Sequence, residues 1–218
     1  MKKILDEIMK YLLTRPSIKL TVVWPSHFTI SVMKRFNEIQ LSTEQLKVIC
    51  ATIKRKAPCK LLVFGLGNDS VFWSGLNRDG VTVFLEHNRD WFQKIIKRSK
   101  NMKAFLISYD TNRKDWKMFL EDTSLLNMTL PNDVEKEEWD VILVDAPGGG
   151  NDQAPGRMKS IFLSSRLIKD SGDIFVHDCD REVEDIYCNK FLGKENLETE
   201  IRAPIGVLRH YHITNRSS

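Results

Sequence analysis

Residues 61–86 read LLVFGLGNDSVFWSGLNRDGVTVFLE, and this stretch decides the fold. Its apolar run Leu61–Phe64 has the composition of a strand buried on both faces of a parallel sheet. The glycine turn 65–67 follows it, and then a helical pattern that begins near Asp69. A second β-branched strand, Val81–Leu85, ends at Glu86. The stretch therefore predicts a strand–turn–helix–strand unit, as found in α/β proteins.

The glycine turn and Glu86 together have the pattern of a nucleoside site. Gly65 and Gly67 allow a ligand to approach the backbone beside unpaired N–H groups of the following helix. Glu86 lies 19 positions after Gly67, close to the spacing of roughly 20 at which a carboxylate binds a ribose diol. Ser70 replaces the third glycine of the dinucleotide pattern, which favours a nucleoside without a pyrophosphate, such as S-adenosylmethionine, over NAD. A tight turn without a ligand is the alternative.

The rest of the chain continues the alternation of strand and helix. Further strands are expected near residues 104–108, 139–145 and 173–178, and helices near 42–56, 88–96, 116–120, 157–168 and 181–192. The segments 197–201 and 206–213 have the pattern of an antiparallel edge hairpin. This alternation predicts an α/β fold whose mainly parallel sheet is covered by helices on both faces. Ligands of such folds bind beyond the carboxyl ends of the strands.

The first 41 residues stand apart from this alternation. Residues 3–13 carry apolar side chains at helical spacing, and residues 18–40 mix extended and helical signals. Ser42 and Gln45 then form a capping box that opens the first helix of the alternating region. We therefore expect an N-terminal extension, residues 1–41, and an α/β domain, residues 42–218.

The composition is that of a globular protein without a membrane span. The 218 residues are 42% hydrophobic and 28% charged, and no apolar run approaches the roughly 20 residues of a spanning helix. A soluble chain is expected, cytoplasmic, or lumenal in the Golgi if an anchor was trimmed. Residues 1–60 hold 12 Lys/Arg against 4 Asp/Glu, which suits either an acidic partner or a solvated helix surface. The four cysteines form no CxxC pair and are expected to be buried thiols.

Six polar side chains follow strands on the predicted ligand edge: Glu86, Asp110, Asp145, His177, Asp178 and Asp180. Asp145 and Asp178, with Asp180 or water, could hold a hard divalent cation such as Mg²⁺ or Mn²⁺. His177 could instead act as a general base, because its ordinary pKa of ~6.5 lies near neutrality. Helix capping and hydrogen-bonded strand ends are the structural alternatives.

The glycine-rich segment after Asp145 is expected to touch the acceptor. Gly148, Gly149 and Gly150 make a loop suited to closing over a substrate, or a plain surface loop. Arg157 opens the next helix and could bind a carboxylate or sugar hydroxyls, or form an ion pair. The GxSxG, HExxH and P-loop motifs are absent from the sequence, so these hydrolase and kinase classes have no support.

Taken together, the motifs resemble the plant polysaccharide-biosynthesis methyltransferases, of which glucuronoxylan 4-O-methyltransferase is typical. The resemblance covers roughly residues 42–213 and rests on LLVFGLGNDSVFW, VTVFLE, WDVILVDAP, APGRMKSIF, IFVHDCDREVE and FLGKENL. It implies a Rossmann-like class I methyltransferase fold that uses S-adenosylmethionine and has a seven-stranded sheet with an antiparallel C-terminal hairpin.

The resemblance also implies roles for individual residues. Gly65, Gly67, Asp69 and Ser70 would surround the methionine part of the donor, Glu86 its ribose, Asp110 its adenine and Asp145 its methyl group. His177, Asp178 and Asp180 would lie beside the acceptor, and a divalent cation at these acids is known among related sugar methyltransferases.

The sequence thus leads to an S-adenosylmethionine-dependent sugar O-methyltransferase with a glycan acceptor, with glucuronic acid or another hexose or deoxyhexose as the methylated unit. The loop 148–151 differs from the pattern of the xylan enzymes, which leaves the acceptor sugar open. A nucleic-acid methyltransferase is one alternative, disfavoured by the acidic ligand edge. A non-catalytic scaffold of glycan biosynthesis is another. The oligomeric state is not indicated.

Overall fold

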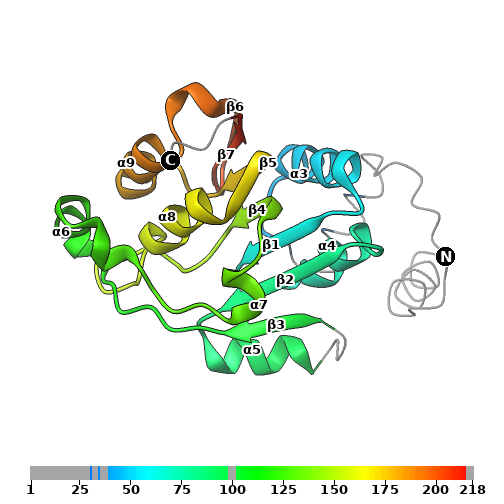
Figure 1. Ribbon diagram of the computed structural model, residues 1–218, viewed down its shortest axis with the longest axis horizontal. Coiled ribbons are helices and arrows are strands. Elements are labelled where there is room, and N and C mark those ends of the chain that lie inside the picture. The colour runs from blue at the N-terminus through cyan, green and yellow to red at the C-terminus, as the bar shows by residue number, and fades with distance from the viewer. Residues whose placement is uncertain (1–29, 31–33, 35–38, 98–101, 215–218) are drawn as a thin grey trace.

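The computed structural model describes residues 30, 34, 39–97 and 102–214, and these form one sheet with helices on both faces (Figure 1). The seven strands have the order β3-β2-β1-β4-β5-β7-β6. The pairs among β1 to β5 are parallel, whereas β7 is antiparallel to both β5 and β6. The predicted class I methyltransferase architecture, with its antiparallel hairpin, is confirmed.

The strands begin and end close to the positions that the apolar runs predict. They are β1 Lys60–Phe64, β2 Val81–Glu86, β3 Lys103–Leu106, β4 Trp139–Val144, β5 Ile168–Val176, β6 Leu197–Ala203 and β7 Gly206–Ile213. β1 and β4 are neighbours at the centre and nearly every residue in them is buried, as a strand covered on both faces requires.

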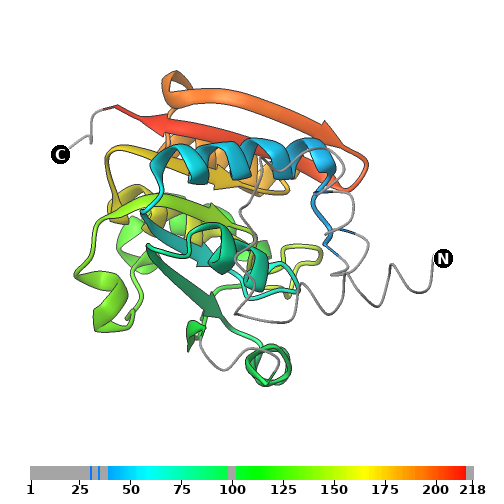
Figure 2. The ribbon, with the colours of Figure 1, turned by 90° about the vertical axis from the view of Figure 1, so that its right-hand side faces the viewer.

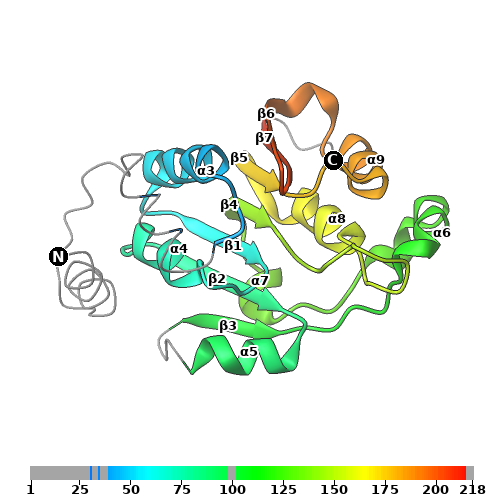
Figure 3. The same ribbon diagram turned by 180° about the vertical axis from the view of Figure 1, so that it is seen from behind.

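The helices form two layers, which can be followed by comparing Figures 1 and 3. They are α3 Thr43–Lys56, α4 Ser70–Leu76, α5 Arg89–Ile96, α6 Trp116–Glu121, α7 Asn132–Glu135, α8 Met158–Leu167 and α9 Glu182–Phe191. Alternate residues of β1 separate the two cores. Leu61 and Val63 pack with α3, α4 and α5, whereas Leu62 and Phe64 pack with α8 and α9.

Local sequence signals fix where two helices start. Ser42 Oγ accepts from the Gln45 N–H at 3.1 Å and Gln45 Oε1 accepts from the Ser42 N–H at 2.8 Å, so the predicted capping box is present. Asn88 caps α5 by accepting from the Trp91 N–H at 2.9 Å.

One prediction about element length is wrong, and the structure adds two short elements before β4. β5 begins at Ile168, directly after α8, because a bulge lets residues 169–172 remain in the strand. Between the helix predicted near 116–120 and β4, the structure adds a 3₁₀ turn, Thr123–Leu126, and α7. Leu126, Leu130 and Val134 are buried and anchor this segment on the sheet.

The proposed extension contributes to the core. Ile30, Ile39 and Leu41 are buried in the same cluster as α3, so the packing does not stop at residue 42. The predicted helix 3–13 lies outside the described residues. Among the helices that the structure describes, none has the length and hydrophobicity needed to cross a bilayer.

Candidate active site

The glycine bend lies where β1 ends, at the carboxyl edge of the sheet. Gly65 has φ +124°, and an added Cβ would lie 3.2 Å from Ala146 Cβ, so a side chain there would be strained and crowded. The Gly67 N–H donates to Ser70 Oγ at 2.8 Å. Ser70 is buried and shapes the turn from within, while the backbone of the bend forms a cradle beside β4.

Asp69 places a carboxylate at the start of α4. Its Oδ2 accepts from Trp73 Nε1 at 2.9 Å, and it makes no capping bond to the helix backbone. Burial, together with the nearby carboxylate of Asp145, raises the pKa of Asp69 to about 6. The two acids make this part of the edge electronegative, which suits a cationic ligand.

Glu86 ends β2 and lies beside the glycine bend. Oε2 accepts from the Leu66 N–H at 3.1 Å, and Oε1 accepts from the N–H groups of His87 and Asn88 at 2.8 Å each. Burial raises the pKa of Glu86, but the His87 side chain and these backbone donors outweigh it and hold the pKa below its usual range. The carboxylate is therefore ionised and oriented, with acceptor capacity left for a diol.

Asp110, which follows β3, is exposed and pairs with a lysine of α8. Its side chain is 81% exposed and lies 2.6 Å from Nζ of Lys159, a buried lysine of α8 that also donates to Asn127 O. The hydrogen bond from Lys159 lowers the pKa of Asp110. At the same sheet edge the Tyr109 hydroxyl lies 2.8 Å from Ser160 Oγ, and the Tyr109 ring meets His87 edge-on at 5.9 Å.

Asp145 follows β4, and its carboxylate is held in place by the side chains of Arg157 and His177. Its Oδ1 lies 3.2 Å from Arg157 Nη2 and 3.0 Å from His177 Nδ1. Burial raises the pKa of Asp145, but the His177 hydrogen bond and the Arg157 charge hold it below its usual range. The side chain is 30% exposed against 12% for Asp178, so Asp145 is the more accessible of the two carboxylates.

Arg157 is buried, and its two terminal nitrogens are taken by oxygen atoms of the strand tips, whereas its Nε has no hydrogen-bond partner among the described residues. Its guanidinium donates to the carbonyls of Asp145 and His177, and pairs with the carboxylates of Asp145 and Asp178, the latter at 2.7 Å. It thereby joins the tips of β4 and β5. These contacts suit a positioning role, and the predicted contact of Arg157 with the acceptor stays a prediction.

His177 lacks the exposed ring nitrogen that a general base needs. Nδ1 is taken by Asp145, and Nε2 is buried without a hydrogen-bond partner. A Cβ added to Gly206, the first residue of β7, would lie 3.2 Å from this Nε2. In this arrangement Nδ1 of His177 orients Asp145, and its predicted role as general base stays a prediction.

The three acids predicted to bind a cation do not form a metal site. Asp178 Oδ2 pairs with Arg157 at 2.7 Å and with Arg181 Nη1 at 2.9 Å, and Asp180 Oδ1 accepts from the Val207 N–H at 2.9 Å. Across residues 39–97 and 102–214, no group of three His, Cys, Asp or Glu side chains is arranged to hold a metal ion. All three predicted ligands are paired, Asp145 and Asp178 with arginine and Asp180 with the backbone of the hairpin.

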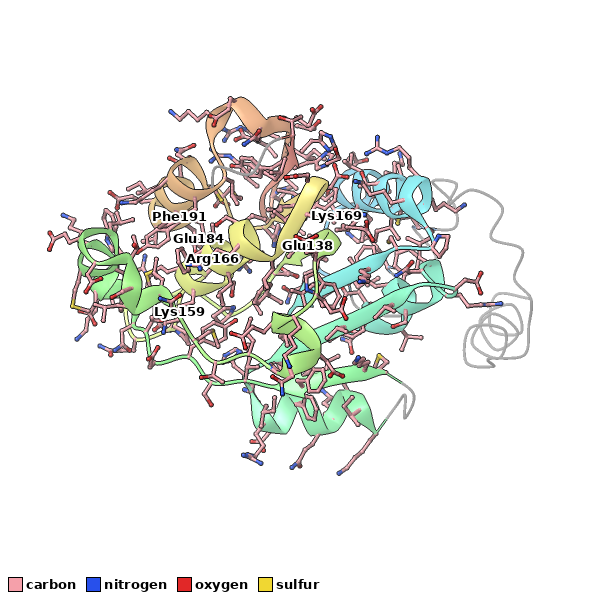
Figure 4. The ribbon with its side chains drawn as sticks, viewed as in Figure 1. Glu138, Lys159, Arg166, Lys169, Glu184 and Phe191 are labelled. Atoms are coloured by element: carbon pink, nitrogen blue, oxygen red, sulfur yellow. The ribbon has the colours of Figure 1, made fainter. Side chains whose placement is uncertain are left out.

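The loop after Asp145 is anchored on both sides. The Gly156 N–H donates to Gly148 O at 3.1 Å, and the Arg113 N–H donates to Ala154 O at 2.8 Å. Gly149 is buried, and a Cβ there would lie 2.7 Å from Oε1 of Glu184. Glu184 is itself fully buried on α9, where this helix packs on α8 (Figure 4).

Sequence comparison assigns the chain to a family. The family model described as IRX15/IRX15L/GXM matches residues 44–127 and 117–211. The chain belongs to the IRX15/IRX15L/GXM family. Within that family it is 35% identical over 195 residues to glucuronoxylan 4-O-methyltransferase 2 of Arabidopsis thaliana, covering 80% of this chain and 66% of that protein. It is 32% identical over 204 residues to arabinogalactan O-methyltransferase 2 of the same plant, covering 82% and 69%. The chain thus spans slightly less than two thirds of the first of these relatives.

Solved structures support the fold of this IRX15/IRX15L/GXM member. A putative caffeoyl-CoA O-methyltransferase from Staphylococcus aureus superposes with a TM-score of 0.54 at 14% identity, over 97% of this chain and 98% of that one. The O-methyltransferase TomG from Streptomyces achromogenes, solved with SAM, gives 0.50 at 12% identity, over 97% and 96%. At these identities the likeness concerns the class I fold.

Sequence reasoning missed two charged residues near the site. Arg181 and Glu184 follow the VHDCD segment and resemble the start of an ordinary surface helix. Arg181 is the N-cap of α9 and Glu184 lies in its first turn, so the start of the predicted helix was the available signal.

Proposed function

We propose that this protein is an S-adenosylmethionine-dependent O-methyltransferase that methylates a sugar hydroxyl of a glycan. The observation that carries the proposal is the carboxyl edge of the sheet, where the Gly65 bend, ionised Glu86 and clamped Asp145 lie together. The related glucuronoxylan and arabinogalactan O-methyltransferases support a polysaccharide acceptor of the xylan or arabinogalactan type. We assign the catalytic domain to residues 42–218, with residues 1–41 as an extension.

The residues present fit the donor. The backbone cradle at Gly65 and Gly67 would admit the nucleoside without a side chain in the way, and Glu86 has oxygen lone pairs left for a ribose diol. Asp69 and Asp145 would surround the positively charged methionine part. Bound there, S-adenosylmethionine supplies an electrophilic methyl group. Asp110 pairs with Lys159, and its predicted contact with the adenine stays a prediction.

Asp145 is the residue that would act on the acceptor. An ionised, partly exposed carboxylate can accept a hydrogen bond from a sugar hydroxyl and orient its oxygen for attack. It can also accept the proton that the hydroxyl releases as its oxygen attacks the methyl group. Arg157 and His177 fix its position, so it needs little reorganisation when the reaction occurs.

A methyl-transfer assay tests the proposal. Purified protein and isotopically labelled donor are incubated with oligosaccharides from glucuronoxylan and arabinogalactan, with RNA as a comparison. We expect labelled methyl ethers on a saccharide and none on RNA. Calorimetry should show donor binding that Glu86→Gln weakens roughly 10-fold or more, by loss of charge-assisted hydrogen bonds.

Glu137, which pairs with Lys60 at the opposite edge of the sheet, provides the matched control. Glu137→Gln should leave donor affinity unchanged. Failure of the wild-type protein to bind the donor would contradict the whole assignment. Donor binding without transfer to any saccharide would instead support a scaffold.

A further inference from the structure

Two buried thiols lie in contact behind the tip of β5. Cys179 follows the His177–Asp178 segment, and Cys188 lies on α9. Their Sγ atoms are 3.8 Å apart, and both residues are buried. Cys59, also buried, has its Sγ 3.4 Å from Asn77 Oδ1 and serves as a comparison.

We propose that Cys179 and Cys188 form an intramolecular disulfide when the chain folds in the presence of a low-molecular-weight disulfide such as oxidised glutathione. A disulfide has an S–S length of about 2.05 Å, so each sulfur would need to move only ~0.9 Å from its present position. Cys179 Sγ would give up its 3.3 Å contact with Val176 O. Cys179 is otherwise held by its N–H, which donates to Val207 O at 2.9 Å.

The chemistry balances as two thiol–disulfide exchanges. The Cys179 thiolate attacks one sulfur of glutathione disulfide and releases the first glutathione thiolate, which leaves a mixed disulfide. The Cys188 thiolate then attacks the Cys179 sulfur and releases the second. The cysteines lose two electrons and two protons in total, and two reduced glutathione molecules carry them away.

Burial determines when this exchange takes place. In the folded protein the hydrogen bond to Cys188 and burial raise the pKa of Cys179 well above its usual value, so little thiolate is present. The reaction therefore belongs to the stage before α9 packs against the sheet. The closed loop would include Asp180, Arg181 and Glu184, and would hold α9 to the strand tip that carries Asp178.

Refolding in glutathione buffers tests the pairing independently of any methyltransferase activity. The full chain is unfolded, reduced, and refolded at graded ratios of reduced to oxidised glutathione; exchange is stopped with acid, and free thiols are counted in denaturant. We expect two free thiols instead of four under oxidising conditions, and a proteolytic peptide pair joined at Cys179 and Cys188. The melting temperature should exceed that of the reduced protein by roughly 5–10 °C.

Two variants sharpen the outcome. Cys50→Ser, at another buried cysteine, should keep the crosslink, whereas Cys188→Ser should lose it and show no oxidation-dependent rise in melting temperature. Four free thiols in the wild-type protein at every glutathione ratio would overturn the proposal. Crosslinks that join Cys50 or Cys59 in place of this pair would overturn it equally.

Discussion

At the scale of single residues, Asp145 depends on its neighbours for both charge and direction. Arg157 is buried and meets four oxygen acceptors from the tips of β4 and β5. A buried guanidinium requires such pairing, since an unpaired one would be strongly destabilising. The same contacts that satisfy Arg157 therefore keep Asp145 ionised at the edge of the site.

Replacing Asp145 separates catalysis from folding. We expect Asp145→Asn to lower the turnover number about 10²–10³-fold, because the neutral amide cannot accept the proton that leaves the acceptor hydroxyl. Arg157 retains Asp178 and two carbonyl oxygens, so the melting temperature should fall by only a few degrees. Steady-state kinetics and thermal melts measure the two effects. Asp152→Asn, at an exposed ion pair with Arg113, is the control, and near-normal turnover by Asp145→Asn would remove Asp145 from the mechanism.

Asp69 should make donor binding depend on pH. Its pKa of about 6 is raised, so the carboxylate is ionised above that pH and neutral below it. A cationic donor favours the ionised form, and its affinity should weaken up to ~10-fold between pH 7 and pH 5. Calorimetry across this range measures the effect. Asp69→Asn should bind more weakly at pH 7 and lose this part of the pH dependence; an unchanged profile would show that another group is responsible.

At the scale of elements, the loop between β4 and α8 takes its shape from α9. Gly149 lies against Glu184 and Arg181, with no room for a Cβ. We expect Gly149→Ala to displace the loop and raise the acceptor KM several-fold, while donor affinity stays unchanged. Gly148→Ala is the matched control, because nothing lies within 4 Å of a Cβ there. Equal acceptor KM values for the two variants would show that this contact does not set the acceptor site.

The same elements show what a sequence can and cannot predict. Apolar periodicity and the Ser42–Gln45 box located α3 because these signals depend on neighbours in the chain. The carboxyl edge followed from strand order alone. The burial of Arg157 and Lys159 could not be predicted, because both residue types are usually exposed and their burial depends on partners that other elements supply. Asp180 looked like a ligand because its partner, the Val207 N–H, is 27 residues away.

At the scale of the whole molecule, α3 spans the sheet and fastens the C-terminal hairpin at both edges. Figure 2 shows α3 lying along β5 and β7. At the carboxyl edge, Gln45 Nε2 donates at 2.9 Å to the carbonyl of Gly206, the first residue of β7, which lies beside His177. At the opposite edge, Lys56 Nζ lies 2.8 Å from Asp173 Oδ2 on β5. Helix α3 is thus bonded to the C-terminal hairpin and to β5, and the hairpin in turn lies against His177 at the candidate active site.

Asp173 makes this connection sensitive to acid. It is fully buried, and its Oδ2 pairs with Nζ of Lys56. Its Oδ1 lies 2.8 Å from Nε2 of His210 and 3.1 Å from Nδ1 of His212. Burial raises its pKa, but these partners outweigh it and lower the pKa from 3.8 to about 2. A depressed carboxyl pKa contributes stability that is complete above the unfolded value of 3.8 and is lost as the pH falls through 2. Allowing for solvent screening of the partly exposed Lys56 and His212, this amounts to ~1–2 kcal/mol.

Denaturant melts of the wild-type protein and Asp173→Asn between pH 2 and pH 7 measure the contribution. The variant should be less stable at pH 7, and the difference between the two proteins should shrink as the pH falls below 4. Asp140→Asn is a suitable control, because Asp140 pairs with Lys169 on the same edge of the sheet but is more exposed than Asp173. A difference that stayed constant from pH 7 to pH 2 would mean that Asp173 acts through packing, and that its charge does not fasten α3 to the hairpin.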